Sequence, residues 1–307
     1  GGGEAKSTRQ TMKELLVIAI PITLGSAGLQ IINLFDTMIY MRRLTGALAW
    51  SSDAADTAKG IYNFCQTIFN LPCSLITPIT ISIIPTVTAA LTRGNADGAR
   101  HTEESAVRIT GLIAMPCAFG LALLAEPITR AVYMRNRFSA HDAEMTAQIL
   151  RLFALGIPFM SANEVLTKLF FAKQRVKAPM LSSLAAILVN IMLCAVLVQT
   201  VGFSGIGIAS TASVAVCAVL NLALLSRDGA LLTRRDFADL LRMLVCTAVM
   251  GAVVFAFDRF TALQNDLLRV LCCGAVGIAV YGAASLCLPT AEIRTLKERI
   301  LKRSSHD

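Results

Sequence analysis

Residues 60–90 read GIYNFCQTIFNLPCSLITPITISIIPTVTAA, and this stretch decides the fold. It is long enough to cross a hydrocarbon layer of about 30 Å, which takes ~20 mostly apolar residues as a helix. It carries no charge but three prolines, Pro72, Pro78 and Pro85. Membrane helices tolerate proline because neighbouring groups satisfy the freed carbonyls. The stretch is therefore predicted to be a bent or hinged helix that spans a membrane.

The rest of the chain repeats this apolar pattern. Of the 307 residues, 55% are hydrophobic and 16% are charged, whereas soluble domains carry about 25% charged residues. The net charge of +8 would suit nucleic acid, but the basic residues lie mostly in short gaps between apolar runs. We therefore predict an all-α, polytopic membrane helical bundle of about eight transmembrane helices and no nucleic-acid partner. The predicted spans are Met12–Leu44, Thr57–Leu91, Ala106–Tyr133, Ala143–Ala172, Pro179–Val201, Gly205–Leu225, Phe237–Phe257 and Asp266–Leu288.

The gaps between spans predict the orientation of the chain. With eight spans, the N-terminal segment, every second gap and the C-terminal tail lie on one side. That side holds sixteen basic residues in its gaps, and the other holds eight. Because basic residues gather in cytoplasmic loops, both ends of the chain are predicted to be cytoplasmic.

Polar side chains form stripes along the first two spans. In the first span Gln30, Asn33, Thr37 and Tyr40 share one face, and Asp36 lies beside them near the outer boundary. Two interpretations of Asp36 are open. It lines a cavity, or it is a carboxylate that caps the helix or lies at the membrane interface. The second span has a longer stripe, which indicates either a water-filled cavity or polar contact between helices. Its members are Asn63, Gln66, Thr67, Asn70, Ser74 and Thr77.

Several other polar residues fall within or beside the spans. Glu164 and Lys168 are four residues apart, which suits an ion pair, although Lys168 can also extend to the interface. Arg42 and Arg43 end the first span and can contact a phosphate or lipid headgroup, or serve as an interfacial anchor. Asn190 and Asn221 each lie within an apolar span. Asparagines in such positions commonly form hydrogen bonds between membrane helices.

The sequence contains no catalytic or metal-binding motif, so we expect neither an enzyme nor a cofactor. The three histidines lie in gaps or the tail. All nine cysteines lie in or beside apolar runs without CxxC spacing. We interpret them as small apolar packing residues.

Two runs resemble a known transporter family. IAIPITLG at 18–25 with NLFDTMIYMRRL at 33–44 is similar to the seventh helix of the MOP exporter superfamily, and residues 60–90 are similar to its eighth. The pattern is closest to the branch of stage V sporulation protein B and the MurJ-type lipid II flippases. Within that branch the sporulation proteins fit better, because the second span has no cavity arginine. Full-length members have two six-helix lobes around a cavity and a final helix pair.

The resemblance implies a domain layout in which only the second half of such a protein is present. Residues 1–11 would be a cytoplasmic loop or cloning remnant, 12–228 the six-helix second lobe, 229–289 the terminal helix pair and 290–307 a basic tail. The implied partners are membrane lipids, a lipid-linked saccharide and a missing N-terminal lobe.

The implied function is a flippase of the bacterial cytoplasmic membrane for a lipid-linked saccharide precursor, working by alternating access. Cell-wall or polysaccharide synthesis would use such a precursor. Asn33, Asp36, Asn63, Gln66, Asn70 and Ser74 would line the cavity, and Pro21, Pro72 and Pro78 would act as hinges. A cation-coupled multidrug exporter of the same superfamily is the alternative. A membrane enzyme acting on lipid-linked sugars is a weaker one.

Overall fold

The structure, a computed structural model, describes residues 52–133, 140–202, 204–227, 234–261 and 265–294, with six single residues before 52. These segments form helices and no strand. The helices are α2 (Ser52–Thr92), α3 (Ala96–Leu123), α4 (Ala125–Tyr133), α5 (Ala140–Ala154), α6 (Ile157–Ala172), α7 (Lys177–Thr200), α8 (Ser204–Ser226), α9 (Arg234–Thr261) and α10 (Asp266–Cys287). The predicted all-α bundle is confirmed.

Seven of the predicted spans have counterparts in the described residues. Six helices, α2, α3 and α7 to α10, are each long and apolar enough to cross a membrane. The pair α5 and α6 supplies a seventh span, bent by 41°. The bend falls at Leu155 and Gly156, just before Pro158. By contrast α2 continues as one helix through its three prolines. Of the predicted first span, Met12–Leu44, only five scattered positions up to Thr23 are described, so this span remains a prediction.

The third predicted span differs most from the structure. Helix α3 begins at Ala96, well before the predicted Ala106, because the side chain of Asn95 caps it by accepting a hydrogen bond of 2.8 Å from the Gly98 amide. This helix ends at Leu123, and α4 is a separate short helix. The charged residues at 97–104 therefore extend a helix rather than form a loop.

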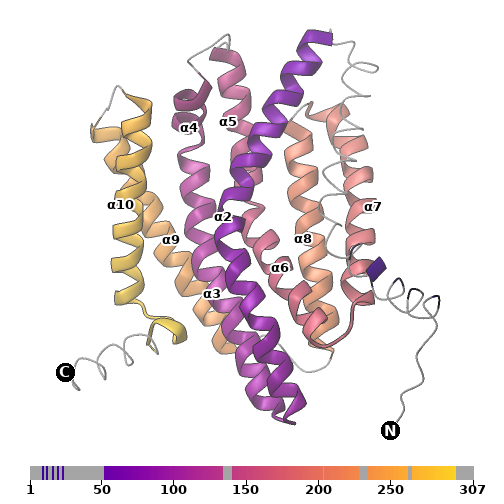
Figure 1. The fold of residues 1–307 in the computed structure, drawn as a ribbon. Helices are drawn as coiled ribbons and strands as arrows, with labels where there is room; N and C mark the ends of the chain where they lie inside the picture. The colour runs from indigo at the N-terminus through magenta and orange to yellow at the C-terminus, as the bar shows by residue number, and fades with distance from the viewer. Residues whose placement is uncertain are drawn as a thin grey trace.

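The helices run up and down, so alternate connections meet at the same end of the bundle (Figure 1). The α2–α3, α6–α7 and α8–α9 connections lie at the lower end in that view, together with the segment after α10. We call this the lower end. It is the end that the charge count predicts to be cytoplasmic.

Two apolar clusters hold the bundle together along its height. The first joins α2, α3, α5 and α8, and includes Tyr62, Phe153 and Ile206. A second, nearer the lower end, joins α2, α3 and α6 through residues such as Val87 and Phe170. A further cluster attaches α9 and α10 to α3 through Met250, Val254 and Cys273. The terminal pair thus packs on one side of the remaining helices (Figure 1).

Buried amides link the helices as predicted. The Asn221 side chain of α8 donates a 2.7 Å hydrogen bond to Asn163 Oδ1 of α6. Asn190 of α7 donates to the Ser213 hydroxyl of α8 at 3.3 Å. Such pairs contribute about 0.6 kcal/mol on average inside a membrane. The prediction of interhelical bonds at both asparagines is confirmed.

The cysteines behave as packing residues. All nine are free thiols, and six of them are buried. Cys65 and Cys194, for example, lie in the first apolar cluster at zero exposure.

Gly205 sets the spacing of α7 and α8, which form an antiparallel hairpin (Figure 1). A Cβ atom at Gly205 would lie 2.6 Å from the carbonyl carbon and oxygen of Leu197. Replacing it with alanine forces two backbones apart, so we expect Gly205→Ala to cost about 1–3 kcal/mol and lower the melting temperature in detergent. Fluorescence-detected size-exclusion chromatography after heating measures this.

Gly274 of α10 is the matched control, because nothing lies within 4 Å of a Cβ atom there. Gly274→Ala should leave stability equal or raise it, since alanine is the better helix former. Equal melting of the two variants would contradict the close approach at Gly205.

Candidate functional site

One face of α2 packs into the bundle and the opposite face is open. Ile61, Cys65 and Phe69 are buried, and the Tyr62 and Phe69 rings contact the Phe153 ring at centroid distances of 5.8 and 5.7 Å. On the other side the side chains of Asn63, Thr67, Asn70 and Ser74 are exposed. These four residues follow helical spacing, so they form one continuous polar face of about 16 Å. We call this the amide face.

Hydroxyl groups along α2 are satisfied by their own helix. Thr67 donates to the Asn63 carbonyl at 2.9 Å, and Ser74 donates to the Leu71 carbonyl at 2.7 Å. The same holds for Thr77, which donates to the Cys73 carbonyl at 3.0 Å. The side-chain amides of Asn63 and Asn70 have no hydrogen bond to any other described residue. They are therefore the groups of this face that are open to an external partner.

Gln66 departs from the predicted stripe. It is half-buried, and its Nε2 donates to the Tyr62 hydroxyl at 3.1 Å. Gln66 lies at the edge of the stripe, and its side chain points toward the bundle. The apolar flank of the amide face is instead exposed, with Leu71 at 56% and Leu75 at 65%. The face therefore combines hydrogen-bonding amides with apolar side chains.

The predicted ion pair between Glu164 and Lys168 does not occur among the ion pairs of the described segments. Both side chains are half-buried, and Glu164 Oε1 accepts a long hydrogen bond of 3.5 Å from the Thr80 hydroxyl. Glu164 thus faces α2 rather than the next turn of its own helix. The alternative, in which Lys168 extends to the interface, remains a prediction.

The remaining predicted site residues lie outside the described residues. They are Pro21, Asn33, Asp36, Arg42 and Arg43. Their assignment remains a prediction.

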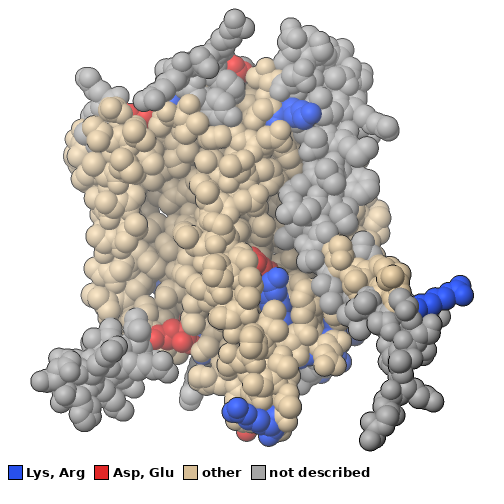
Figure 2. All heavy atoms as spheres, in the orientation of Figure 1, with Lys and Arg blue, Asp and Glu red and all other residues tan. Residues whose placement is uncertain are grey.

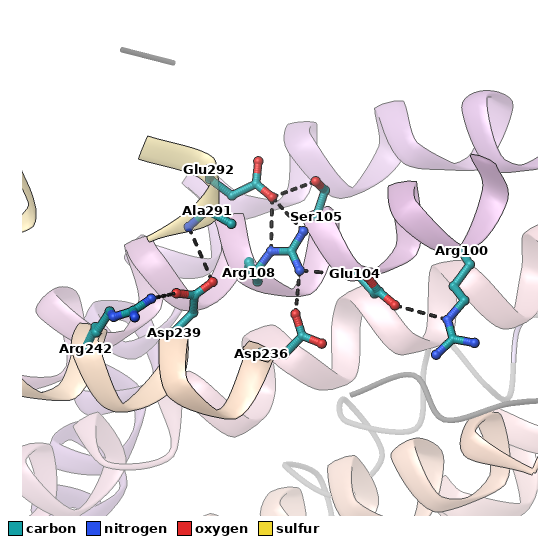
Figure 3. Close-up of polar contacts among 9 residues, drawn as sticks. All are labelled: Arg100, Glu104, Ser105, Arg108, Asp236, Asp239, Arg242, Ala291 and Glu292. Atoms are coloured by element: carbon teal, nitrogen blue, oxygen red, sulfur yellow. Dashed lines mark hydrogen bonds and ion pairs between the residues drawn. The ribbon is translucent and has the colours of Figure 1, made fainter. Parts of the chain in front are cut away.

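A charged network at the lower end was not predicted. Arg108 of α3, only 8% exposed, forms an ion pair with Asp236 of α9 and another of 3.0 Å with Glu292 (Figure 3). Ser105 donates to the same Glu292 carboxylate at 2.6 Å. The Asp236 carboxylate is buried. A single guanidinium therefore joins three segments that are far apart in the sequence.

The segment after α10 is held at a second point. The buried carboxylate of Asp239 accepts a hydrogen bond of 3.3 Å from the Ala291 amide and pairs with Arg242 at 2.6 Å. Nearby, Lys173 at the end of α6 pairs with the buried Glu103 of α3 at 2.9 Å. The lower end of α3 thus connects both α6 and the terminal pair.

Charge is distributed as a membrane protein requires. Figure 2 shows mostly uncharged surface over the visible face, with charged side chains near its two ends and at one place just below the centre. A membrane interior penalises exposed charge but accepts apolar surface. The apolar spans and the amide face define a polytopic membrane protein, a helical bundle with one exposed polar face.

The chain belongs to the MurJ family of lipid II flippases, because the family model described as lipid II flippase MurJ matches residues 4–272. This is a family of transporters and not of enzymes. The expectation that the sporulation-protein branch fits better is not supported, since the matching model and the relatives below are MurJ flippases.

Two relatives illustrate the similarity. A probable lipid II flippase MurJ of Bdellovibrio bacteriovorus is 32% identical over 181 residues, which cover 59% of this chain and 35% of the relative. One of Rhizobium meliloti is 25% identical over 309 residues, covering 96% of this chain and 55% of the relative. The chain thus spans about half the length of the curated relatives it matches, or less.

Solved structures share the fold. A lipid II flippase MurJ in an inward closed conformation aligns with a TM-score of 0.72 at 17% identity, covering 93% of this chain and 56% of that one. A MATE transporter in the bent conformation aligns with a TM-score of 0.59 at 16% identity, covering 89% and 63%. The bundle is therefore the fold of this transporter superfamily.

The network around Arg108 predicts a specific loss of stability. Arg108→Gln removes the guanidinium that pairs with the buried Asp236 carboxylate and with Glu292. Breaking a buried ion pair costs about 3 kcal/mol or more of unfolding free energy. We expect a lower melting temperature and faster proteolysis of the segment after α10. Limited proteolysis followed by mass spectrometry measures the second effect.

Arg100→Gln is the control, because Arg100 is exposed and its ion pair with Glu104 lies within its own helix (Figure 3). Loss of the Arg100 guanidinium should lower the free energy of unfolding by about 0.5 kcal/mol or less. If both variants release the segment equally, the network does not hold it.

Proposed function

We propose that the full-length protein flips a lipid-linked saccharide precursor, lipid II in particular, across the bacterial cytoplasmic membrane. Alternating access would move the precursor between the two leaflets. The amide face of α2 is the observation that carries this proposal. Membership of the MurJ family supports it.

The amide face needs a polar environment. Asn63 and Asn70 lie in the outer half of an apolar helix, and an unsatisfied amide in hydrocarbon is costly. Since no described residue bonds them, water, substrate or another part of the protein must do so. The relatives' greater length supports a central cavity between this lobe and a first lobe. In that arrangement residues 12–228 form the second lobe and 229–289 the terminal pair.

The chemistry of the face suits an amphiphilic substrate. Asparagine side chains both donate and accept, as sugar hydroxyls do. Leu71 and Leu75 beside them offer apolar contact to a lipid chain. Asn33, Asp36 and Ser74 are proposed to complete the cavity wall, whereas Gln66, also predicted there, is turned toward Tyr62 and the bundle.

Movement between two states requires flexible points. Pro72 and Pro78 each remove one backbone hydrogen bond from α2, and we propose them as hinges together with Pro21. Arg42 and Arg43 are proposed to contact a phosphate or headgroup. Both ends of the chain are proposed to lie in the cytoplasm.

A multidrug exporter would need an acidic coupling residue within the membrane. Glu164 is the described candidate, but it accepts a hydrogen bond from Thr80 and is half-buried. The family match and the amide face favour the flippase.

The proposal predicts the effect of making the face apolar. Asn63→Leu with Asn70→Leu in the full-length protein should reduce flipping at least about tenfold, since two hydrogen bonds of ~1 kcal/mol each are lost. Complementation of a strain depleted of its own flippase, with membrane levels measured by immunoblot, tests this.

Gln199→Leu is the matched control, because Gln199 is an exposed amide on α7, away from the amide face. It should complement like the wild type. Full complementation by the double variant at normal membrane levels would refute the cavity assignment.

A further inference from the structure

We propose that a cavity at the lower end, where α6 turns into α7, binds an anionic phospholipid of the adjoining leaflet. The cavity has a volume of about 480 Å³. Its described lining includes three basic residues, Arg175, Lys177 and Arg227, and no acidic one. We call it the basic pocket. It lies apart from the amide face of α2.

The turn that carries two of these bases has a defined geometry. Helix α6 ends with the Arg175 amide bonded to the Phe170 carbonyl at 2.8 Å and the Gln174 amide bonded to the Phe171 carbonyl at 3.0 Å. This pair of bonds is a Schellman motif, which places Gln174 in the left-handed region at a φ of 58°. Glycine usually occupies that position. The backbone thus holds Arg175 and Lys177 in place without a flexible loop.

Two bases of the basic pocket, Lys177 and Arg227, have no counter-charge among the described neighbours. Lys173, just before the turn, pairs with Glu103 and so contributes little net charge. Lys177 and Arg227 form no ion pair with any residue that the structure describes. Both are exposed at the pocket. A ligand with a net negative charge would supply the missing counter-charge.

The inner wall of the pocket is apolar. Phe170, Leu181 and Leu224 line it beside the bases. From Leu181 an exposed apolar stripe continues along α7 at helical spacing, toward the other end of the bundle. Its members are Leu181 at 59%, Leu184 at 45%, Leu188 at 59%, Met192 at 67% and Val196 at 59% exposure.

Together these features match a phospholipid in chemistry and orientation. The phosphate would contact the bases at the end of the bundle, and an acyl chain would lie on the α7 stripe within the membrane. Basic pockets between transmembrane helices on the cytoplasmic side bind anionic headgroups in this way. A zwitterionic lipid brings its own cation, which Lys177 and Arg227 repel, so an anionic headgroup is preferred.

Native mass spectrometry of the purified full-length protein tests the proposal. The probes are dioleoyl phosphatidylglycerol and dioleoyl phosphatidylcholine, which share acyl chains but differ in net charge. Lys177→Gln with Arg227→Gln should weaken phosphatidylglycerol binding at least about tenfold and leave phosphatidylcholine binding unchanged. Leu181→Asn with Leu188→Asn should weaken both lipids.

Two controls make the result specific to the pocket. Arg93→Gln with Arg100→Gln removes two exposed bases at the same end that do not line the pocket, and should retain wild-type affinity. Lys177→Arg with Arg227→Lys keeps the charge and should also retain it. Wild-type binding of phosphatidylglycerol by the charge-removed pocket variant would overturn the proposal, as would an equal loss in the control pair. The readout requires no flipping activity.

Discussion

The structure depends on the rule that every polar group inside a hydrocarbon layer must find a partner. Backbone groups obey it by forming helices, which is why the described residues contain no strand. Side chains obey it by pairing across helices, as Asn221 does with Asn163. Hydroxyls obey it within one helix, as Thr67 and Ser74 do on α2. Many of these needs are met inside the bundle, although a few buried atoms, such as Asn221 Oδ1, have no hydrogen-bond partner among the described residues. Polar groups that are open over a continuous surface therefore carry information about function.

Asn63 and Asn70 are such groups. They lie on the same helix as satisfied hydroxyls, so their openness is a property of the exposed face and not of α2 as a whole. The bundle thereby presents one surface that is unsuited to lipid and others that suit it, such as the exposed leucines of α7. A surface of the first kind belongs against water, substrate or a second lobe. In the proposed arrangement, this asymmetry would orient the bundle within a larger transporter.

Hydropathy predicted the spans well because lipid imposes one local requirement, a run of about 20 apolar residues. The amide bonds at Asn190 and Asn221 were also predictable, since a lone amide in such a run has few alternatives. The early start of α3 escaped prediction because charged residues there read as a loop until Asn95 is seen to cap a helix. The orientation of Gln66 toward Tyr62 escaped for another reason. Helical spacing places a residue at the edge of a stripe but does not choose its rotamer.

Arg108 shows most clearly what sequence reasoning lacks. Its partner Asp236 is 128 positions away, so no local pattern links them. The consequence reaches beyond one ion pair. At the lower end, Arg108 forms an ion pair with the buried Asp236, which links α3 to the terminal pair. Lys173 forms an ion pair with the buried Glu103, which links α3 to α6. Lys177 and Arg227, at the same end, have no such partner among the described residues. The basic residues at this end therefore fall into two groups. Arg108 and Lys173 hold helices together, whereas Lys177 and Arg227 are the ones proposed to bind lipid. Only their partners in the folded structure distinguish the two groups.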